Sequence, residues 1–206
     1  MITIIDSGIS NIGSLVNMLR KIGAPSLVTN NPEEIKRAEK IILPGIGSFD
    51  AGMQRLAELD IIGVLNEKVM KEKIPTLGIC LGMQLMAAKS SEGKLPGLNW
   101  FDGEVVRFDF SKLNDASIKI PHMGWNFVEP KKPSRLFKDL QNLPRFYFVH
   151  GYHFKEKQNA DVLGITQFGY PFASAIEKEN IAGVQFHPEK SHKFGMQLLK
   201  NFIEQY

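Results

Sequence analysis

Cysteine is almost absent from this sequence, with one in 206 residues, so no disulfide can form within the chain. Cys80 is therefore inert, reactive, or paired with another molecule. A strong charge of one sign is lacking too, because 25 basic residues face 22 acidic ones, which gives no electrostatic reason to expect nucleic acid or an acidic membrane as a partner. The 43% hydrophobic and 23% charged residues exclude disordered, collagen-like and disulfide-scaffold classes.

Long apolar runs are also missing. No stretch approaches the roughly 18 residues of a membrane-spanning helix, and Met1–Asp6 is typical of a short strand rather than of a signal peptide. We therefore expect no membrane association and a cytoplasmic location, where a thiol stays reduced. No linker or internal repeat interrupts the chain, so we expect residues 1–206 to form a single domain.

Neither a metal site nor a phosphate loop stands out. His150 and His153 are three residues apart, but no nearby cysteine completes a zinc set. Gly45 and Gly47 are not followed by the Gly-Lys-Ser/Thr of a phosphate loop. We expect no metal ion and no cofactor.

Strand-like and helix-like segments alternate in the first half of the chain. The predicted strands are Ile2–Asp6, Ser26–Thr29, Lys40–Leu43 and Thr76–Ile79. The helices predicted after them are Asn11–Ile22, one that starts at Asn31–Glu34, Ala51–Lys71 and Met83–Lys89. This alternation predicts an α/β fold of flavodoxin type, with a mostly parallel open sheet flanked by helices.

The second half is richer in strands, which loops rather than long helices separate. The candidates are Glu104–Phe110, Trp125–Val128, Arg145–Val149, Val162–Gln167, Ala173–Glu177 and Ala182–Phe186. A helix is predicted from about Ser191 to Tyr206. We expect this β-rich portion to be an addition to the α/β half.

Cys80 lies between two glycines, in Gly78-Ile79-Cys80-Leu81-Gly82, after a strand-like run and before a helix. A nucleophile on a tight strand-to-helix turn needs small residues on both sides, because the backbone folds back there. The helix N-terminus favours a thiolate, and the Leu81 N–H would point at a developing oxyanion. The alternative is a buried, inert cysteine.

His187 is the best candidate for a base, in Gln185-Phe186-His187-Pro188-Glu189. Proline forces the residue before it into an extended conformation, and residues two apart in extended chain share a face. Glu189 could therefore orient one ring nitrogen of His187 while the other faces the thiol. An ordinary turn is the alternative for this triplet alone.

The loop Leu43–Phe49 follows a strand and contains Gly45 and Gly47. Its glycines allow a close approach of backbone to a ligand, so one N–H could complete an oxyanion hole. A simple tight turn is equally compatible with this segment.

Gly78–Gln84 together with Gln185–Glu189 resembles the class I (triad-type) glutamine amidotransferases. Further matches are Pro44–Phe49, Pro121–Asn126, Phe146–His150 and His187–Ser191, so the resemblance extends from about Ile4 to Phe202. It implies that Cys80 attacks the amide of L-glutamine and forms a γ-glutamyl thioester, while His187 moves the proton and Glu189 orients it. The residues that it implies for the glutamine pocket are Gly45, Gln84, His150 and Gly151, with Gly47 and Leu81 as backbone donors to the oxyanion.

The resemblance is strongest to family members that work as glutaminase subunits in a heterodimer. These pass ammonia to a barrel-type cyclase partner that makes imidazole glycerol phosphate in histidine biosynthesis. By resemblance, Asn11, Trp125 and Asn126 would face that partner, although Trp125 alone could also be a core aromatic. Direct transfer also has a physical reason, since ammonia released into neutral water is protonated and loses its nucleophilicity.

Two positions depart from the family pattern. Ser7 replaces the tyrosine of a usual Asp-Tyr-Gly, and Gly151 replaces a usual serine after His150. Both leave the acceptor of the ammonia open, since paralogs in the family supply ammonia for amidination of a surface-polysaccharide sugar. A non-catalytic scaffold and a cysteine hydrolase of another substrate are further alternatives. The intact triad argues against the first, and Gln84 with the Gly45–Gly47 loop argues against the second.

Overall fold

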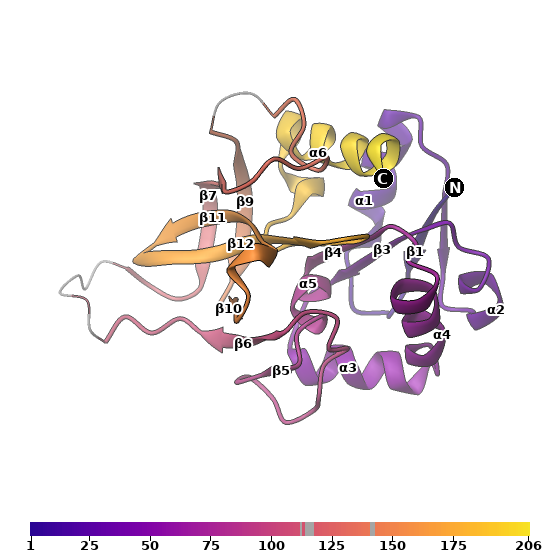
Figure 1. Ribbon diagram of the computed structural model, residues 1–206, viewed down its shortest axis with the longest axis horizontal. Helices are drawn as coiled ribbons and strands as arrows, with labels where there is room; N and C mark the ends of the chain where they lie inside the picture. The colour runs from indigo at the N-terminus through magenta and orange to yellow at the C-terminus, as the bar shows by residue number, and fades with distance from the viewer. Residues whose placement is uncertain (112, 114–117, 141–142) are drawn as a thin grey trace.

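The computed structural model describes residues 1–111, 113, 118–140 and 143–206. An eleven-stranded sheet runs through the molecule, and a two-stranded sheet lies beside it (Figure 1). The main path of the large sheet has the order β2-β1-β3-β4-β13-β12-β10-β6-β5. None of the helices in the described ranges is long and apolar enough to cross a membrane.

The first part of this sheet is parallel, as predicted. Its strands are β1 (Ile2–Ile5), β2 (Ser26–Thr29), β3 (Lys40–Gly45), β4 (Thr76–Cys80) and β13 (Ile181–Val184). β13 is far away in sequence but pairs in parallel with β4, with Val184 opposite Ile79. The strands that lead to Cys80 and His187 are therefore neighbours. Because they are parallel, both residues lie at the carboxyl ends of these strands, on the same side of the molecule.

Helices cover both faces of the parallel strands. One face carries α1 (Ile12–Ile22) and α6 (His192–Gln205), through side chains such as Leu19 and Phe202. The other face carries α2 (Pro32–Ile35), α3 (Phe49–Glu58), α4 (Ile62–Asn66) and α5 (Leu81–Leu85). Figure 1 shows the two groups of helices on opposite sides of the sheet.

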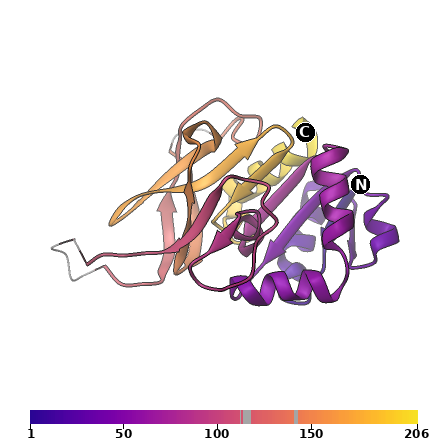
Figure 2. The same cartoon turned by 60° about the horizontal axis from the view of Figure 1, so that its bottom comes forward.

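The remaining strands are mostly antiparallel and form the β-rich portion. β12 (Tyr170–Lys178) pairs with β13, and beyond it lie β10 (Tyr152–Glu156), β6 (Gly103–Arg107) and β5 (Lys89–Ser90). β11 (Val162–Phe168) joins β12 to the short β8 (Glu129–Pro130). β7 (His122–Phe127) pairs with β9 (Arg145–His150) in the two-stranded sheet, on the opposite side of the molecule from β1 and β2 (Figure 2).

Two helix predictions were wrong in extent. The helix expected over Ala51–Lys71 is broken, because Asp60 has a φ of 53° between α3 and α4, and a π-helical turn follows at Glu67–Lys71. The helix expected at Met83–Lys89 begins directly after Cys80 and ends at Leu85. It stops there because the next segment caps it: Leu98 N–H donates to Leu85 O and Trp100 N–H donates to Met86 O.

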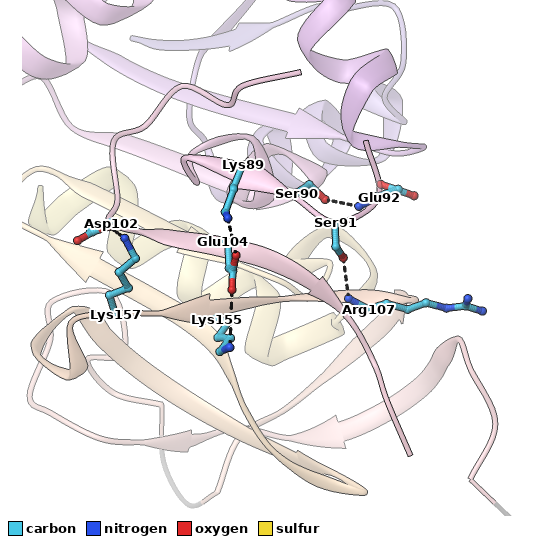
Figure 3. Close-up of polar contacts among 9 residues, drawn as sticks. All are labelled: Lys89, Ser90, Ser91, Glu92, Asp102, Glu104, Arg107, Lys155 and Lys157. Carbon is cyan, nitrogen blue, oxygen red and sulfur yellow. Dashed lines mark hydrogen bonds and ion pairs between the residues drawn. The ribbon is translucent and has the colours of Figure 1, made fainter. Parts of the chain in front are cut away.

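A ladder of charged side chains lines β5, β6 and β10 at the far edge of the sheet (Figure 3). Glu104 contacts both Lys89 and Lys155, at 3.2 and 3.6 Å, and the hydrogen bond from Lys89 lowers the pKa of this carboxyl. Directly after β5, Glu92 N–H donates to Ser90 Oγ at 3.0 Å. This turn directs Glu92 away from the ladder, toward the pocket described next.

Candidate active site

Cys80 occupies a strained turn between β4 and α5, with φ 55° and ψ −111°. The two flanking glycines are sterically required. A Cβ on Gly82 would lie 1.7 Å from Leu43 O, and one on Gly78 would lie 2.8 Å from Met83 N. The elbow predicted from the spacing is present, and its strain is confined to the one residue that bears a thiol.

His187 follows β13, and its backbone is held from two sides. Its N–H donates to Tyr147 O at 2.9 Å, and its carbonyl accepts from Ser191 Oγ at 2.6 Å. Ser191 Oγ also accepts from Tyr147 N–H at 3.0 Å, which ties the segment to β9. The imidazole side chain is 3% exposed, so its position is fixed by the surrounding core.

Glu189 lies beside this imidazole, with 2.8 Å between Glu189 Oε1 and His187 Nδ1. Burial lowers the pKa of His187, but the Cys80 thiol and the Glu189 carboxylate outweigh it and raise the pKa to about 10. The other ring nitrogen, Nε2, is buried with no hydrogen-bond partner among the described residues. The imidazole is therefore oriented by a carboxylate and has one nitrogen free to exchange a proton with the thiol.

Cys80 and His187 open into one cavity of about 410 Å³. Five residues expected at the site line it: Gly47, Leu81, Gln84, His150 and Gly151. Gly45 does not line it. It pairs with Cys80 across the sheet instead, and a Cβ there would press on Leu81 at 3.0 Å, so its role is to let β3 approach the elbow closely.

Gln84 has its amide nitrogen fully engaged. Nε2 donates to Tyr152 O at 3.1 Å and to Gln185 Oε1 at 2.9 Å, which uses both of its hydrogens. Its Oε1 is consequently the atom left for a ligand, as an acceptor. A substrate amide NH₂ or ammonium group would satisfy it.

The loop after β3 supplies a second wall. Gly47 has a φ of 100°, which a glycine adopts without strain. The preceding Ile46 N–H donates to Ile9 O at 2.9 Å, so in this conformation it is directed to the first loop of the chain. Leu81 begins α5, and its N–H belongs to the unpaired first turn of that helix.

Two charged residues in the cavity wall were missed by the sequence reasoning. Glu92 and Lys190 both line it, and Glu92 Oε2 is fixed by the Phe49 N–H at 2.8 Å. Together they offer an anion and a cation to a zwitterionic ligand. Lys190 directly follows the His-Pro-Glu triplet and could have been noticed, whereas nothing in the sequence near Glu92 marks it.

The three residues expected at a partner surface have different environments. Trp125 is 41% exposed on β7 and stacks on His192 at 5.4 Å, so the interpretation of it as a core aromatic is wrong. Met123 and Phe127 are exposed on the same face. Asn126 points the other way and bonds to His122. Asn11 precedes α1 and lines a small cavity next to His187 and Glu189.

Comparison with known proteins places these features in context. Residues 3–206 match the sequence model of the family described as "Glutamine amidotransferase class-I". Imidazole glycerol phosphate synthase subunit HisH 2 of Methanococcus maripaludis is 51% identical over 205 residues, covering 100% of both chains. The protein of that name from Pseudomonas aeruginosa is 47% identical, covering 99% of each.

Solved structures support the same fold at low sequence identity. A structure described as a glutamine amidotransferase aligns with a TM-score of 0.75 at 15% identity, covering 98% of this chain and 97% of that one. PurLQS from Thermotoga maritima aligns with a TM-score of 0.74 at 16% identity, covering 99% and 97%.

Proposed function

This chain belongs to the class-I glutamine amidotransferase family, and from that membership we propose that Cys80, His187 and Glu189 form the triad of a glutaminase. One observation carries the proposal. His187 Nδ1 is held by Glu189 at 2.8 Å while its Nε2 is buried and unpaired among the described residues, in the same cavity as Cys80. This is the arrangement that activates a nucleophile through an oriented base.

The proposed reaction has two halves. Cys80 Sγ bonds to the side-chain amide carbon of L-glutamine, and His187 gives its proton to the nitrogen as the C–N bond breaks. Ammonia leaves, and a γ-glutamyl thioester remains on Cys80. A water molecule then attacks the thioester, His187 accepts the proton from that water, and glutamate departs as the thiolate re-forms.

The oxyanion formed in each half needs backbone donors. We assign this role to Leu81 N–H, at the start of α5, and to the Gly47 loop. Helix N-termini favour negative charge because their first N–H groups are unpaired. Since Gly47 is in a conformation that only glycine tolerates well, its peptide can reorient with little steric cost.

Recognition of glutamine follows from the charges in the cavity. Glu92 would accept from the α-ammonium group and Lys190 would pair with the α-carboxylate. Gln84 Oε1 would accept a hydrogen bond from the ligand, because both hydrogens of Gln84 Nε2 are already donated to Tyr152 O and Gln185 Oε1. His150 and Gly151 also line this cavity.

The acceptor of the ammonia lies on a partner chain in this proposal. Full-length relatives at 41–51% identity bear the name imidazole glycerol phosphate synthase subunit HisH. We therefore propose that this chain is the glutaminase subunit of that synthase in histidine biosynthesis. Its partner would be a barrel-type cyclase, bound through a surface that includes Asn11 and the outward-facing Trp125, with Asn126 next to Trp125 on the inner face of β7.

Two departures from the family pattern are the reason to test a second candidate acceptor. Gly151 lines the glutamine cavity, and Ser7 is buried with its carbonyl accepting from Arg55 Nε at 3.2 Å. In the second candidate, the partner is a paralogous synthase that adds nitrogen to a surface-polysaccharide sugar. The half-reaction at Cys80 is identical in both cases.

We also propose that residues 1–206 act as one domain in the cytoplasm. The two helix-covered faces share the central sheet, and Cys80 and His187 come from different halves of the sequence. The chemistry needs a free thiol, and the cytoplasm keeps thiols reduced.

The test uses the chain together with the cyclase that co-purifies with it. Cys80→Ala and Cys80→Ser should abolish glutamate release from glutamine yet leave turnover with added ammonium salts intact. Glutamine-dependent turnover by either variant would contradict the proposal. The acceptor is identified by supplying the complex with each candidate nucleotide or sugar substrate and following incorporation of ¹⁵N from amide-labelled glutamine.

A further inference from the structure

Gln185 joins the sulfur of Cys80 to the substrate pocket wall. Its Nε2 donates to Cys80 Sγ at 3.7 Å, and its Oε1 accepts from Gln84 Nε2 at 2.9 Å. Because Gln84 can only donate through that nitrogen, the Gln185 amide cannot be turned around, and its NH₂ must face the sulfur. The side chain is fully buried, and the Gln185 backbone N–H is held by Ser174 O at 2.9 Å.

The chain of hydrogen bonds continues away from the pocket. Tyr152 O accepts from Gln84 Nε2 at 3.1 Å and lies 2.7 Å from His150 Nδ1. His150 Nε2 is 3.1 Å from His122 Nδ1, and His122 Nε2 is 3.1 Å from Asn126 Nδ2 on β7. Seven residues from four regions of the sequence are thus connected without a gap.

The direction of these bonds is determined by their ends. Asn126 Nδ2 can only donate, so His122 accepts at Nε2 and donates from Nδ1. His150 accordingly accepts at Nε2 and donates from Nδ1 to Tyr152 O. Both imidazoles must be neutral for this pattern, and burial lowers the pKa of His122 to about 4 and that of His150 to about 3.

Aromatic packing keeps the two imidazoles in place. His122 stacks between Phe148 and Phe168, with ring centroids at 4.6 and 4.2 Å. Phe108 packs against His150 at 5.3 Å. A displacement of β7 would therefore move both rings together with Asn126, rather than being absorbed by loose side chains.

We propose that Gln185 is a positioning residue for the Cys80 nucleophile, set by a hydrogen-bond chain that begins at Asn126 on β7. The proposal rests on the proposed function, because it takes Cys80 as the nucleophile. An N–H aimed at sulfur stabilises the thiolate relative to the thiol and fixes the direction of its lone pairs. Trp125, next to Asn126, faces outward. A partner that shifts β7 by binding to that face would therefore move Asn126 and, through the hydrogen-bond chain, Gln185 at the thiolate.

The simplest test uses the fact that Cys80 is the only cysteine, so alkylation of the full chain by iodoacetamide reports on this thiol alone. Gln185→Met keeps the volume and removes the donor. We expect the midpoint of the alkylation rate against pH to rise by about one pH unit, a roughly tenfold loss of rate at pH 7. The exposed Gln158→Met is the matched control and should alkylate like the wild type.

Gln185→Glu is the second variant, because it preserves shape where Gln185→Met could disturb the core. Its carboxylate cannot donate to sulfur, so we expect a rise of the midpoint at least as large. Thermal unfolding verifies that each variant is folded. Unchanged alkylation profiles in folded samples of either variant would overturn the positioning role.

The connection to β7 is tested by a double-mutant cycle. Asn126→Leu should slow alkylation at pH 7 by about threefold, and Asn126→Leu with Gln185→Met should be no slower than Gln185→Met alone. An unchanged rate for Asn126→Leu, or fully additive losses, would overturn the chain from β7. Glutamine hydrolysis by Cys80→Ala would instead overturn the proposed function, so the two failures are distinguishable.

Discussion

Glu189 Oε1 lies 2.8 Å from His187 Nδ1, although only Pro188 separates the two residues in sequence. The backbone of His187 is extended, with φ −101° and ψ 96°, and Pro188 then opens a short 3₁₀ turn, Pro188–Lys190. The carboxylate is consequently carried back to the ring of its near neighbour. Both side chains are almost fully buried, so water does not compete for this contact.

The first prediction concerns this contact. Glu189→Gln keeps the shape but removes the charge, so we expect the pKa of His187 to fall from about 10, because one of the groups that raise it is lost. We also expect kcat for glutamine hydrolysis to drop by about 10² to 10⁴. Ring-nitrogen NMR titration and initial rates measure the two effects.

Glu204→Gln is the matched control for that experiment, since Glu204 is half-exposed on α6 and only loosely paired with Lys200 at 3.9 Å. It should leave both readouts unchanged. A Glu189→Gln enzyme with wild-type kcat would contradict the place of Glu189 in the proposed triad.

The second prediction concerns acid stability. Burial holds the pKa of His150 near 3, well below the 6.5 of an unfolded histidine. The unfolded chain therefore binds more protons between these values, and the stability of the fold is lost as the pH falls below 6.5. At pH 5 we expect His150 alone to cost about 2 kcal/mol of unfolding free energy relative to pH 7.

Urea unfolding at several pH values measures this loss. His150→Gln removes the titrating ring, so its unfolding free energy should vary with pH by about one proton less than that of the wild type. Parallel curves for the two proteins across pH 4 to 7 would contradict the assignment of a buried, neutral His150.

Local sterics made the elbow at Cys80 and the contact between His187 and Glu189 predictable. Glycines on both sides of Cys80, and a proline between His187 and Glu189, constrain the backbone within a few residues, so the geometry follows from spacing alone. The parallel half of the sheet was predictable for a similar reason, because β1, β2, β3 and β4 are short apolar runs between clear helix signals.

The rest depended on contacts between distant segments. Tyr152–Glu156 forms β10, although its two consecutive buried residues, His153 and Phe154, break the alternation expected of a strand. Glu92 enters the pocket only because the turn after β5 directs it there. Gln185 belongs to the segment Gln185–Glu189, but its contact with sulfur depends on the parallel pairing of β13 with β4, which no local pattern reveals.

The third prediction tests the elbow itself. Gly82→Ala would place a Cβ 1.7 Å from Leu43 O, a backbone atom that cannot move without disturbing β3. We expect a loss of more than about 3 kcal/mol in unfolding free energy, or no folded protein. Gly63 lies in α4, where an added Cβ would meet no atom within 4 Å, so Gly63→Ala should instead stabilise the chain by about 0.5 to 1 kcal/mol. Equal effects from the two substitutions would refute the steric account of the elbow.

The last prediction concerns the outward face of β7. Every second residue of β7 points to this face. The three are Met123, Trp125 and Phe127, which are 64%, 41% and 50% exposed, an unusual concentration of large apolar side chains on a short strand. Large aromatics at the centre of an interface contribute most of its binding energy. We therefore expect Trp125→Ala to weaken the complex with the cyclase partner by at least tenfold, measured by calorimetry. Val28→Ala on β2, also an exposed apolar residue, is the control and should bind like the wild type.

Because Trp125 does not belong to the hydrogen-bond chain, Trp125→Ala should also leave the alkylation of Cys80 in the isolated chain unchanged. A slower alkylation would show that the tryptophan acts on the core rather than on the partner.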